Sequence, residues 1–330
     1  MLLCEDTTKP TKKQKFLRQI GHSKTKNIRN FVAKLCFMKK LGNGWFHVLA
    51  IFAVLIWGTT FVATKMLITA GLHPTEIFIY RFIIAYVCIL FISPRKLWSD
   101  SWRDEALLFL SGITGGSLYF ITENTALQYT QAVNVAMIIS GTPLLTTLLA
   151  MAIFRSERTR NPLRIIVGSV IALAGVIVVI YHGNVDLKFN PIGDVLTLCA
   201  AASWAVYSIL LKVLGKKYSA VFLTRKVFAY GLLSMALWLP FHPERFDLAL
   251  LTKPEVLANV LFLGALASML CFTIWTAVVN RLGTVKSTNY INLNPIVTFV
   301  SAYFFLGEVV TPLSLLGAAA IIGGVYVIER

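Results

Sequence analysis

Three charged residues lie within long apolar stretches of this sequence: Lys65, Arg81 and Glu123. Burying a carboxylate in an apolar layer is costly, so such an acid indicates a functional site. Two cations beside one carboxylate leave a net positive charge, which favours a gate or a binding site for a carboxylate-bearing molecule. Two structural alternatives stay open. Lys65 and Arg81 could bury their stems and extend their charges to water, and Glu123 could form a permanent ion pair with either cation.

Glu123 shares a predicted helical face with other residues suited to a site. Gly112, Gly116, Tyr119 and Glu123 are spaced by four, three and four residues, which follows the 3.6-residue helical period. The matching position in the second half of the chain is Trp275, so the acid is not duplicated. A single acid is suited to binding a proton or an amine.

Two prolines stand in the middle of apolar stretches, Pro143 and Pro295. Each removes one helical hydrogen bond, and we expect this to free the carbonyls of Ile139 and Ile291. Helices broken beside polar residues are where membrane carriers place substrate. The alternative is a plain kink whose carbonyl is satisfied by a neighbouring polar side chain. The polar neighbours in question are Ser140, Thr288 and Asn292.

Aromatic residues at Trp57, Tyr119, Trp204 and Trp275 either line a cavity or fill a core. With the residues above they make up the candidate set for substrate binding or gating. That set is Trp57, Lys65, Arg81, Tyr119, Glu123, Asn124, Ser140, Pro143, Trp204, Trp275, Thr288, Asn292 and Pro295.

We expect no metal site and no cofactor. The five cysteines are odd in number and scattered, and the five histidines lie in the basic tail or near the ends of apolar stretches. No GxxxxGK[ST] phosphate-binding pattern occurs, which argues against a nucleotide-driven pump. No pair of aspartates or Ser/His couple falls within the apolar stretches, so we expect no catalytic residue and no enzyme.

These residues must be positioned by membrane helices. The chain of 330 residues is 57% hydrophobic and only 14% charged, whereas a soluble protein carries about 25% charged residues. With about 20 residues needed for each span, the apolar blocks predict an all-α integral membrane protein with ten transmembrane helices. The predicted spans are 45–69, 75–93, 105–127, 131–154, 162–181, 190–214, 219–240, 255–279, 285–306 and 311–328.

Charge distribution predicts the orientation. The net charge of +16 arises partly from a basic tail, since eleven of the 31 Lys and Arg precede Leu41. Most of the others lie in the even-numbered loops, which the positive-inside rule places in the cytoplasm. Both termini are therefore expected in the cytoplasm. Aromatic residues are sparse in the tail, so we expect no nucleic-acid partner.

An internal repeat divides the chain into residues 45–181 and 190–328. Trp57 and Lys65 are eight apart, as are Trp204 and Lys212, and Pro143 precedes Pro295 by 152 positions. Further pairs support the same order: Phe78 to Arg81 with Phe222 to Arg225, and Gly168 and Gly175 with Gly317 and Gly324. Because five helices are an odd number, the second repeat is inverted in the membrane. Residues 1–44 form the tail, with an alternative start near Met38.

The chain resembles the ten-helix EamA-type carriers of the drug/metabolite transporter superfamily between Leu49 and Glu329. The residues that carry the resemblance are Trp57, Gly193-Asp194 leading to Ala202-Ser203-Trp204-Ala205, Asn294-Pro295 and Leu306-Gly307-Glu308. Such carriers are typically bacterial inner-membrane proteins that move amino acids or other small metabolites, often as exporters. The resemblance thus implies a plasma-membrane efflux carrier, and it does not extend to the substrate.

The expected function is secondary transport of amino acids or related zwitterions by alternating access, because a cationic pair beside one acid suits both ends of a zwitterion. The expected partners are a small-molecule substrate and the lipid bilayer, with proton coupling open and a monomer or homodimer as the assembly. The alternatives are a receptor or scaffold that transports nothing, and a passive facilitator of another solute class.

Overall fold

The computed structural model describes residues 42–92, 97–154, 162–182, 191–241, 246–308 and 311–329. Every regular element within these ranges is a helix, and the ranges contain no strand. The predicted basic tail lies outside them as far as Leu41, as does the alternative start near Met38. All of the helices belong to one compact unit, Asn43–Arg330.

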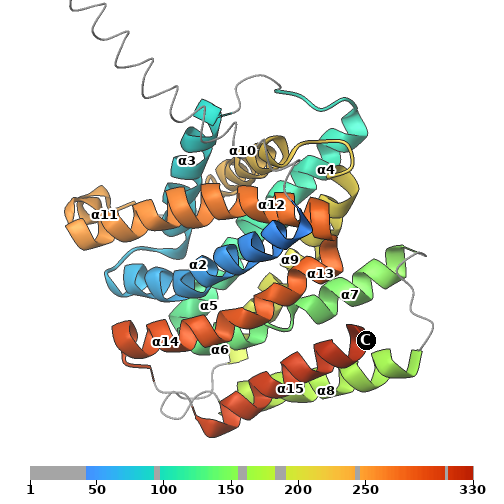
Figure 1. Ribbon diagram of the computed structural model, residues 1–330. Coiled ribbons are helices and arrows are strands. Elements are labelled where there is room, and N and C mark those ends of the chain that lie inside the picture. Colours follow the sequence, from blue (N-terminus) through green and yellow to red (C-terminus); the bar gives the residue numbers. More distant parts are fainter. Residues whose placement is uncertain are drawn as a thin grey trace, which may run out of the picture. The chain divides into compact units, whose positions relative to one another are not determined.

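The helices follow one another in the order shown in Figure 1. They are α2 (Asn43–Thr69), α3 (Pro74–Ile92), α4 (Trp102–Gly112), η2 (Ile113–Ser117), α5 (Leu118–Tyr129), α6 (Ala132–Ile139), α7 (Thr142–Ile153), α8 (Pro162–His182), α9 (Pro191–Leu214), α10 (Ala220–Trp238), η4 (Leu248–Thr252), α11 (Pro254–Leu261), η5 (Phe262–Leu270), α12 (Cys271–Leu282), α13 (Thr284–Thr288), η6 (Asn289–Leu293), α14 (Asn294–Leu306) and α15 (Pro312–Glu329).

Seven helical stretches in the described chain are long and apolar enough to cross a membrane. They are α2, α3, α4 to α5, α6 to α7, α9, α10 and α11 to α12. The other three predicted spans are also helical, as α8, as α13 to α14, and as α15. The predicted all-α membrane architecture is therefore confirmed.

Side-chain contacts identify two opposite ends of the helices. At the end where α2 begins, which we call the proximal end, Arg281 Nε of α12 donates a hydrogen bond to Asn43 Oδ1 (3.1 Å). At the end where α2 finishes, which we call the distal end, Lys65 Nζ donates to the carbonyl of Thr130, just beyond α5 (3.0 Å). Each long helix or helical pair leads from one end to the other.

Glycines join α8 to α15, the last helices of the two halves, which lie side by side (Figure 1). A Cβ atom on Gly175 would lie 2.5 Å from the carbonyl oxygen of Gly317. A Cβ atom on Gly324 would lie 2.4 Å from the carbonyl oxygen of Gly168. The prediction that these glycines allow close helix contact is confirmed, since small residues let backbones approach in a membrane.

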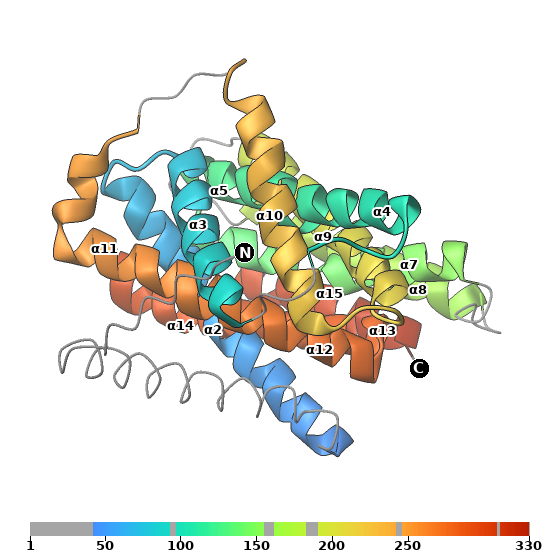
Figure 2. The same ribbon diagram turned by 90° about the horizontal axis from the view of Figure 1, so that it is seen from above.

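The two halves pack against each other in a matching way. The third helix of each half contains a π-helical segment, η2 or η5, which the sequence did not predict. The second helix of each half packs on the opposite half's third helix: α3 on η5, and α10 on α4 and η2 (Figure 2). Close approach depends on glycine, because a Cβ on Gly112 would lie 2.4 Å from Tyr230 Cβ. A Cβ on Gly264 would likewise lie 2.7 Å from Ile84 Cβ.

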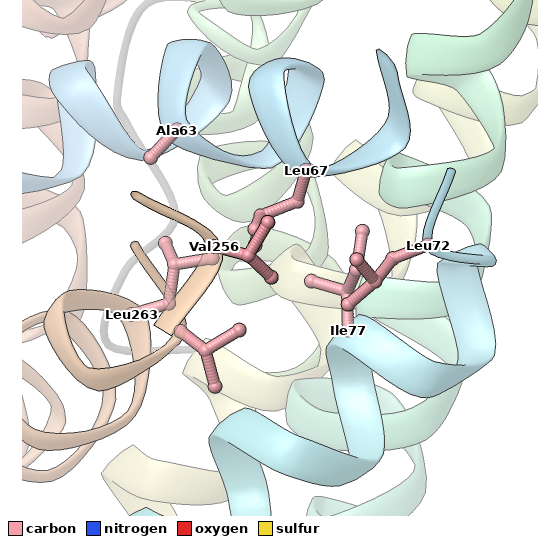
Figure 3. Close-up of a cluster of buried hydrophobic side chains, with 7 residues drawn as sticks. Ala63, Leu67, Leu72, Ile77, Val256 and Leu263 are labelled. Carbon is pink, nitrogen blue, oxygen red and sulfur yellow. The ribbon is translucent and has the colours of Figure 1, made fainter. Parts of the chain in front are cut away.

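An apolar cluster joins the halves at the distal end (Figure 3). It combines side chains of α2, α3 and the turn between them with side chains of α11 and η5, and each is at most 6% exposed. This distal cluster consists of Ala63, Leu67, Leu72, Ile77, Val256, Val260 and Leu263.

Candidate functional site

A narrow cavity of about 30 Å³ lies between the helices of both halves. Trp57 and Trp204 stand near the middles of α2 and α9, so the cavity lies near the middle of these helices. Its lining consists of Trp57, Thr60, Phe61, Arg81, Tyr119, Phe120, Glu123, Ile139, Trp204, Phe272, Ile291 and Asn294.

Two opposite charges face this cavity. Arg81 of α3 and Glu123 of α5 are each 2% exposed. Arg81 Nε donates a hydrogen bond to Ser268 Oγ in η5 (3.0 Å), and the guanidinium carbon lies 4.0 Å from the centre of the Phe120 ring. These two contacts hold the Arg81 guanidinium from both halves of the chain. A single buried charge would be costly, and the opposite charges of Arg81 and Glu123 reduce that cost.

Aromatic rings make up much of the remaining wall. Trp204 lies 5.4 Å from Trp57, 4.9 Å from Tyr119 and 5.5 Å from Phe272, measured between ring centroids. Trp57 Nε1 donates to the carbonyl of Ala267 (3.0 Å), so its indole is tied to the π-helical segment η5. The cavity thus offers flat apolar surfaces beside two buried charges.

Three buried polar atoms of cavity-lining residues have no hydrogen-bond partner within the described ranges: Glu123 Oε2, Trp204 Nε1 and Asn294 Oδ1. A buried polar group without a partner is costly, so such atoms are expected to meet a ligand or water. Two are acceptors and one is a donor. This set suits a molecule that presents an amine and a carboxylate.

The two prolines begin new helices rather than bending continuous ones. Pro143 lies in the first turn of α7, after a break at Ser140 and Gly141, and Pro295 lies in the first turn of α14. The predicted interruption at both sites is therefore present. Ile139 and Ile291, whose carbonyls we expected to be free, both line the cavity.

One of the two carbonyls differs from the expectation. The carbonyl of Ile291 accepts a hydrogen bond from the backbone N–H of Asn294, because η6 is a 3₁₀-helix with bonds between residues three apart. The expected free carbonyl at Ile291 is therefore wrong. Ser140 Oγ donates to the carbonyl of Met137 (2.6 Å) and not to that of Ile139.

Lys65 does not belong to the charged group of the cavity, contrary to the expected cluster of three charges. Its Nζ atom donates to the carbonyls of Leu127 and Thr130, where α5 ends. Glu308 accepts from the backbone N–H groups of Ala132 (2.9 Å) and Val133 (3.1 Å), where α6 begins. A cation at a helix C-terminus and an anion at a helix N-terminus are each favourable, so both residues hold the turn between α5 and α6.

The other predicted residues lie outside the lining. Asn124 Nδ2 donates to the carbonyl of Pro74 (3.1 Å), which joins α5 to the start of α3. Thr288 Oγ1 donates to the carbonyls of Thr284 and Val285 in α13. Asn292 Oδ1 is buried without a partner in the described chain. Trp275 packs behind the lining, with its ring 5.0 Å from that of Trp57.

Several lining residues are missing from the predicted candidate set: Thr60, Phe61, Phe120, Phe272 and Asn294. Thr60 and Phe61 follow Trp57 by one helical turn, and Phe120 lies one turn before Glu123, so the helical period around known candidates was a usable signal. Asn294 stands directly before Pro295. Phe272 likewise lies one turn before the candidate Trp275 in α12.

Within the described residues, no three His, Cys, Asp or Glu side chains gather in a way that could hold a metal ion. The arrangement offers charge recognition and aromatic contact.

Comparison with known proteins gives a match over both halves. The family model described as "EamA-like transporter family" matches residues 44–181 and 191–330. A solved structure described as "Crystal structure of protein" has a similar fold, with a TM-score of 0.59 at 18% identity; the alignment covers 87% of this chain and 96% of the other.

Three relatives are similar over most of their length. An "Uncharacterized transporter" of Archaeoglobus fulgidus is 28% identical over 291 residues, covering 85% of this chain and 96% of the relative. A "Probable terminal-alkyne amino-acid exporter" of Streptantibioticus cattleyicolor is 28% identical over 282 residues, covering 85% and 92%. A "Probable amino-acid metabolite efflux pump" of Salmonella typhimurium is 26% identical over 298 residues, covering 84% and 93%.

Proposed function

Because this chain belongs to the EamA-like transporter family, we propose that it exports amino acids or related zwitterionic metabolites across the inner (plasma) membrane. The chain is a multi-pass membrane protein, and its family consists of transporters of small molecules. We propose that it carries its substrate without chemical change and uses no cofactor.

One observation carries the proposal: Arg81 and Glu123 face the same buried, aromatic cavity. The α-carboxylate of an amino acid would meet Arg81 and the Trp204 N–H, and its ammonium group would meet Glu123 and Asn294. Charged hydrogen bonds are strong in such a layer, since no water competes for them. The aromatic rings would contact the side chain.

The direction of transport rests on the relatives. One bears the name of an amino-acid exporter and another that of an amino-acid metabolite efflux pump. The positive loops support a cytoplasmic position for both termini, which makes the proximal end the cytoplasmic one. Residues 45–181 and 190–328 would then act as inverted repeats that open the cavity alternately to either side.

The cavity is formed by a single chain, which supports a monomer as the transporting unit. We also propose that Glu123 takes up a proton when the substrate leaves, which would couple export to proton entry. The acid suits this role because Arg81, the cation of the lining, already contacts Ser268 and Phe120, and Glu123 Oε2 has no hydrogen-bond partner among the described residues.

The test is a comparison of metabolite release from cells that overexpress the protein, from deletion cells and from cells with an Arg81→Gln variant. We expect one or more amino acids to accumulate outside the overexpressing cells, at least severalfold above the deletion strain. The variant should release no more than the deletion strain while reaching the membrane in equal amount. Liposomes containing the purified protein should move the same amino acid.

If liposomes move none of the released solutes, the receptor or scaffold alternative is favoured. If they move a solute without a charged amine, the facilitator of another solute class is favoured. If a proton gradient across the liposome leaves the transport rate unchanged, the proposed coupling through Glu123 is wrong while the exporter proposal stands.

Exchanging a tryptophan for phenylalanine tests the indole donor. Trp204→Phe keeps a ring in the cavity but removes the unpartnered N–H, so we expect substrate affinity to fall about tenfold or more, as hydrogen bonds to charged groups require. The matched control is Trp275→Phe, which removes an equally unpartnered N–H outside the lining. Binding of the exported amino acid to purified protein measures both. Equal effects of the two changes would contradict a role for the Trp204 N–H.

A further inference from the structure

A polar network joins the two halves at the proximal end, away from the cavity. Lys226 of α10 forms an ion pair with Glu105 of α4, and Tyr230 donates a hydrogen bond to the same carboxylate. The backbone N–H of Ser99 donates to the second oxygen of Glu105 (2.8 Å). Lys226 also lies 4.8 Å from the centre of the Trp98 ring. The charges of this pair are thus enclosed from several directions.

A second group of contacts extends the network along the same boundary. Lys217 Nζ donates to both oxygens of Asp104 (3.1 and 3.0 Å), and Tyr218 donates to Asp104 Oδ2 (2.8 Å). The backbone N–H of Asp100 donates to the Tyr218 hydroxyl (2.9 Å). Residues 97–105 belong to the first half of the chain and residues 217–230 to the second. We call the whole set the proximal network.

The distal end has a different kind of closure. There the corresponding helices, α3 and α11 to η5, meet through the distal cluster of apolar side chains (Figure 3). Glu76 of α3 also accepts a hydrogen bond from the backbone N–H of Asp247 there (2.8 Å). The described contacts between the halves thus include a buried ion pair at the proximal end, and an apolar cluster with one carboxylate hydrogen bond at the distal end.

Burial makes the proximal network selective for one arrangement. The side chains of Lys226 and Glu105 are 7% and 9% exposed, so separating them would leave two charges to be rehydrated. Movement of α10 away from α4 would break the ion pair and the Tyr230 bond together. Apolar contacts at the distal end do not impose this requirement, because they can slide and repack.

We propose that the proximal network is a latch: Glu105 and Lys226 hold α10 against α4 and keep the cavity closed from the proximal side, until both separate during transport. The latch rests on the proposed alternating-access function and adds positioning residues that do not touch the substrate. Loss of the pair shifts the protein towards the state that is open at the proximal end.

Thiol labelling of Thr276→Cys, with the five native cysteines replaced by alanine, reports this state. Thr276 is fully buried and lies one helical turn from Phe272 towards the proximal end. A water-soluble maleimide reaches this position once the proximal side opens. We expect Glu105→Lys and Lys226→Glu each to raise the labelling rate at least tenfold.

Combining the two changes restores opposite charges in reversed positions. On a logarithmic scale, we expect the labelling rate of the double variant to return at least halfway to the parent rate. The return is incomplete because the Ser99 N–H then lacks its acceptor. Glu255→Lys is the matched control, because it reverses an exposed acid on α11 at the distal end. It should label at the parent rate.

Folded single variants with unchanged labelling would overturn the latch, and so would a double variant that labels as fast as the singles. If the charge reversals do not fold, Tyr230→Phe and Glu105→Gln decide the matter, and labelling at the parent rate in both would overturn it. The labelling assay requires no substrate, so its result is independent of the transport assay. If the charge-reversal variants label faster but liposomes transport no amino acid, the exporter proposal is wrong and the latch stands.

Discussion

The affinity of the Glu123→Gln protein for its amino acid is expected to be at least about thirtyfold lower than that of the parent protein. Removing one partner of a buried charge pair costs about 2–5 kcal/mol, and about 1.4 kcal/mol corresponds to a tenfold change in affinity. Glutamine fills the same space and still offers an acceptor, so the loss isolates the charge. Isothermal titration of purified protein with the exported amino acid measures it.

A control for this prediction comes from a second acid with the same burial. Glu76 is also 2% exposed but lies outside the cavity lining, where it accepts from the N–H groups of His73 and Asp247. Glu76→Gln should lower thermal stability and leave affinity within about twofold. The deaminated acid of the same substrate should bind parent and Glu123→Gln proteins alike. Equal losses of affinity in both variants would contradict an amine-binding role for Glu123.

The helices of this chain were predictable because the bilayer leaves the backbone little choice. Polar backbone groups in hydrocarbon must be satisfied internally, so long apolar stretches form helices whatever their neighbours. Repeated glycines such as Gly175 and Gly324 indicated close packing by the same local logic. The π-helical segments η2 and η5 were not predicted. The difference between the π-helical and α-helical periods is too small to detect over five to nine residues.

Charged residues buried in the helices were easier to identify than the directions of their side chains. Lys65, Arg81 and Glu123 are expected to lie beside one another, and two of them do face one cavity. Lys65 instead reaches the carbonyls at the end of α5, a contact that depends on how two helices cross. Sequence spacing within one helix carries no information about that crossing.

The error on the second proline has a definable cause. Thr288 and Asn292 are expected as polar neighbours of Pro295, and an α-helix would bring them to its face, but η6 winds as a 3₁₀-helix over five residues. A 3₁₀-helix has 3.0 residues per turn against 3.6, so the two windings diverge by roughly 100° over that length. Asn294 and Ile291 therefore line the cavity, while Thr288 and Asn292 do not.

Two adjacent glycines in α15 should respond in opposite ways to one added methyl group. At Gly324 a Cβ would lie 2.4 Å from Gly168 O and 2.6 Å from the backbone nitrogen of Ala172, and neither backbone atom can move without shifting α8. At Gly323 a Cβ would meet nothing within 4 Å. We expect Gly324→Ala to separate the two helices and lower the melting temperature by roughly 5 °C, as overpacking of a rigid contact costs about 1–3 kcal/mol.

Gly323→Ala is the matched control, since it adds the same methyl group to the same helix one residue away. It should leave the melting temperature unchanged or slightly raised, because alanine has the higher helix propensity. Thermal unfolding in detergent, followed by intrinsic fluorescence, measures both variants. Because α8 and α15 contribute no residue to the cavity lining, a Gly324→Ala protein kept below its melting temperature should still bind the exported amino acid with parent affinity. Equal stability of the two variants would mean that α8 and α15 do not approach through Gly324 in the membrane.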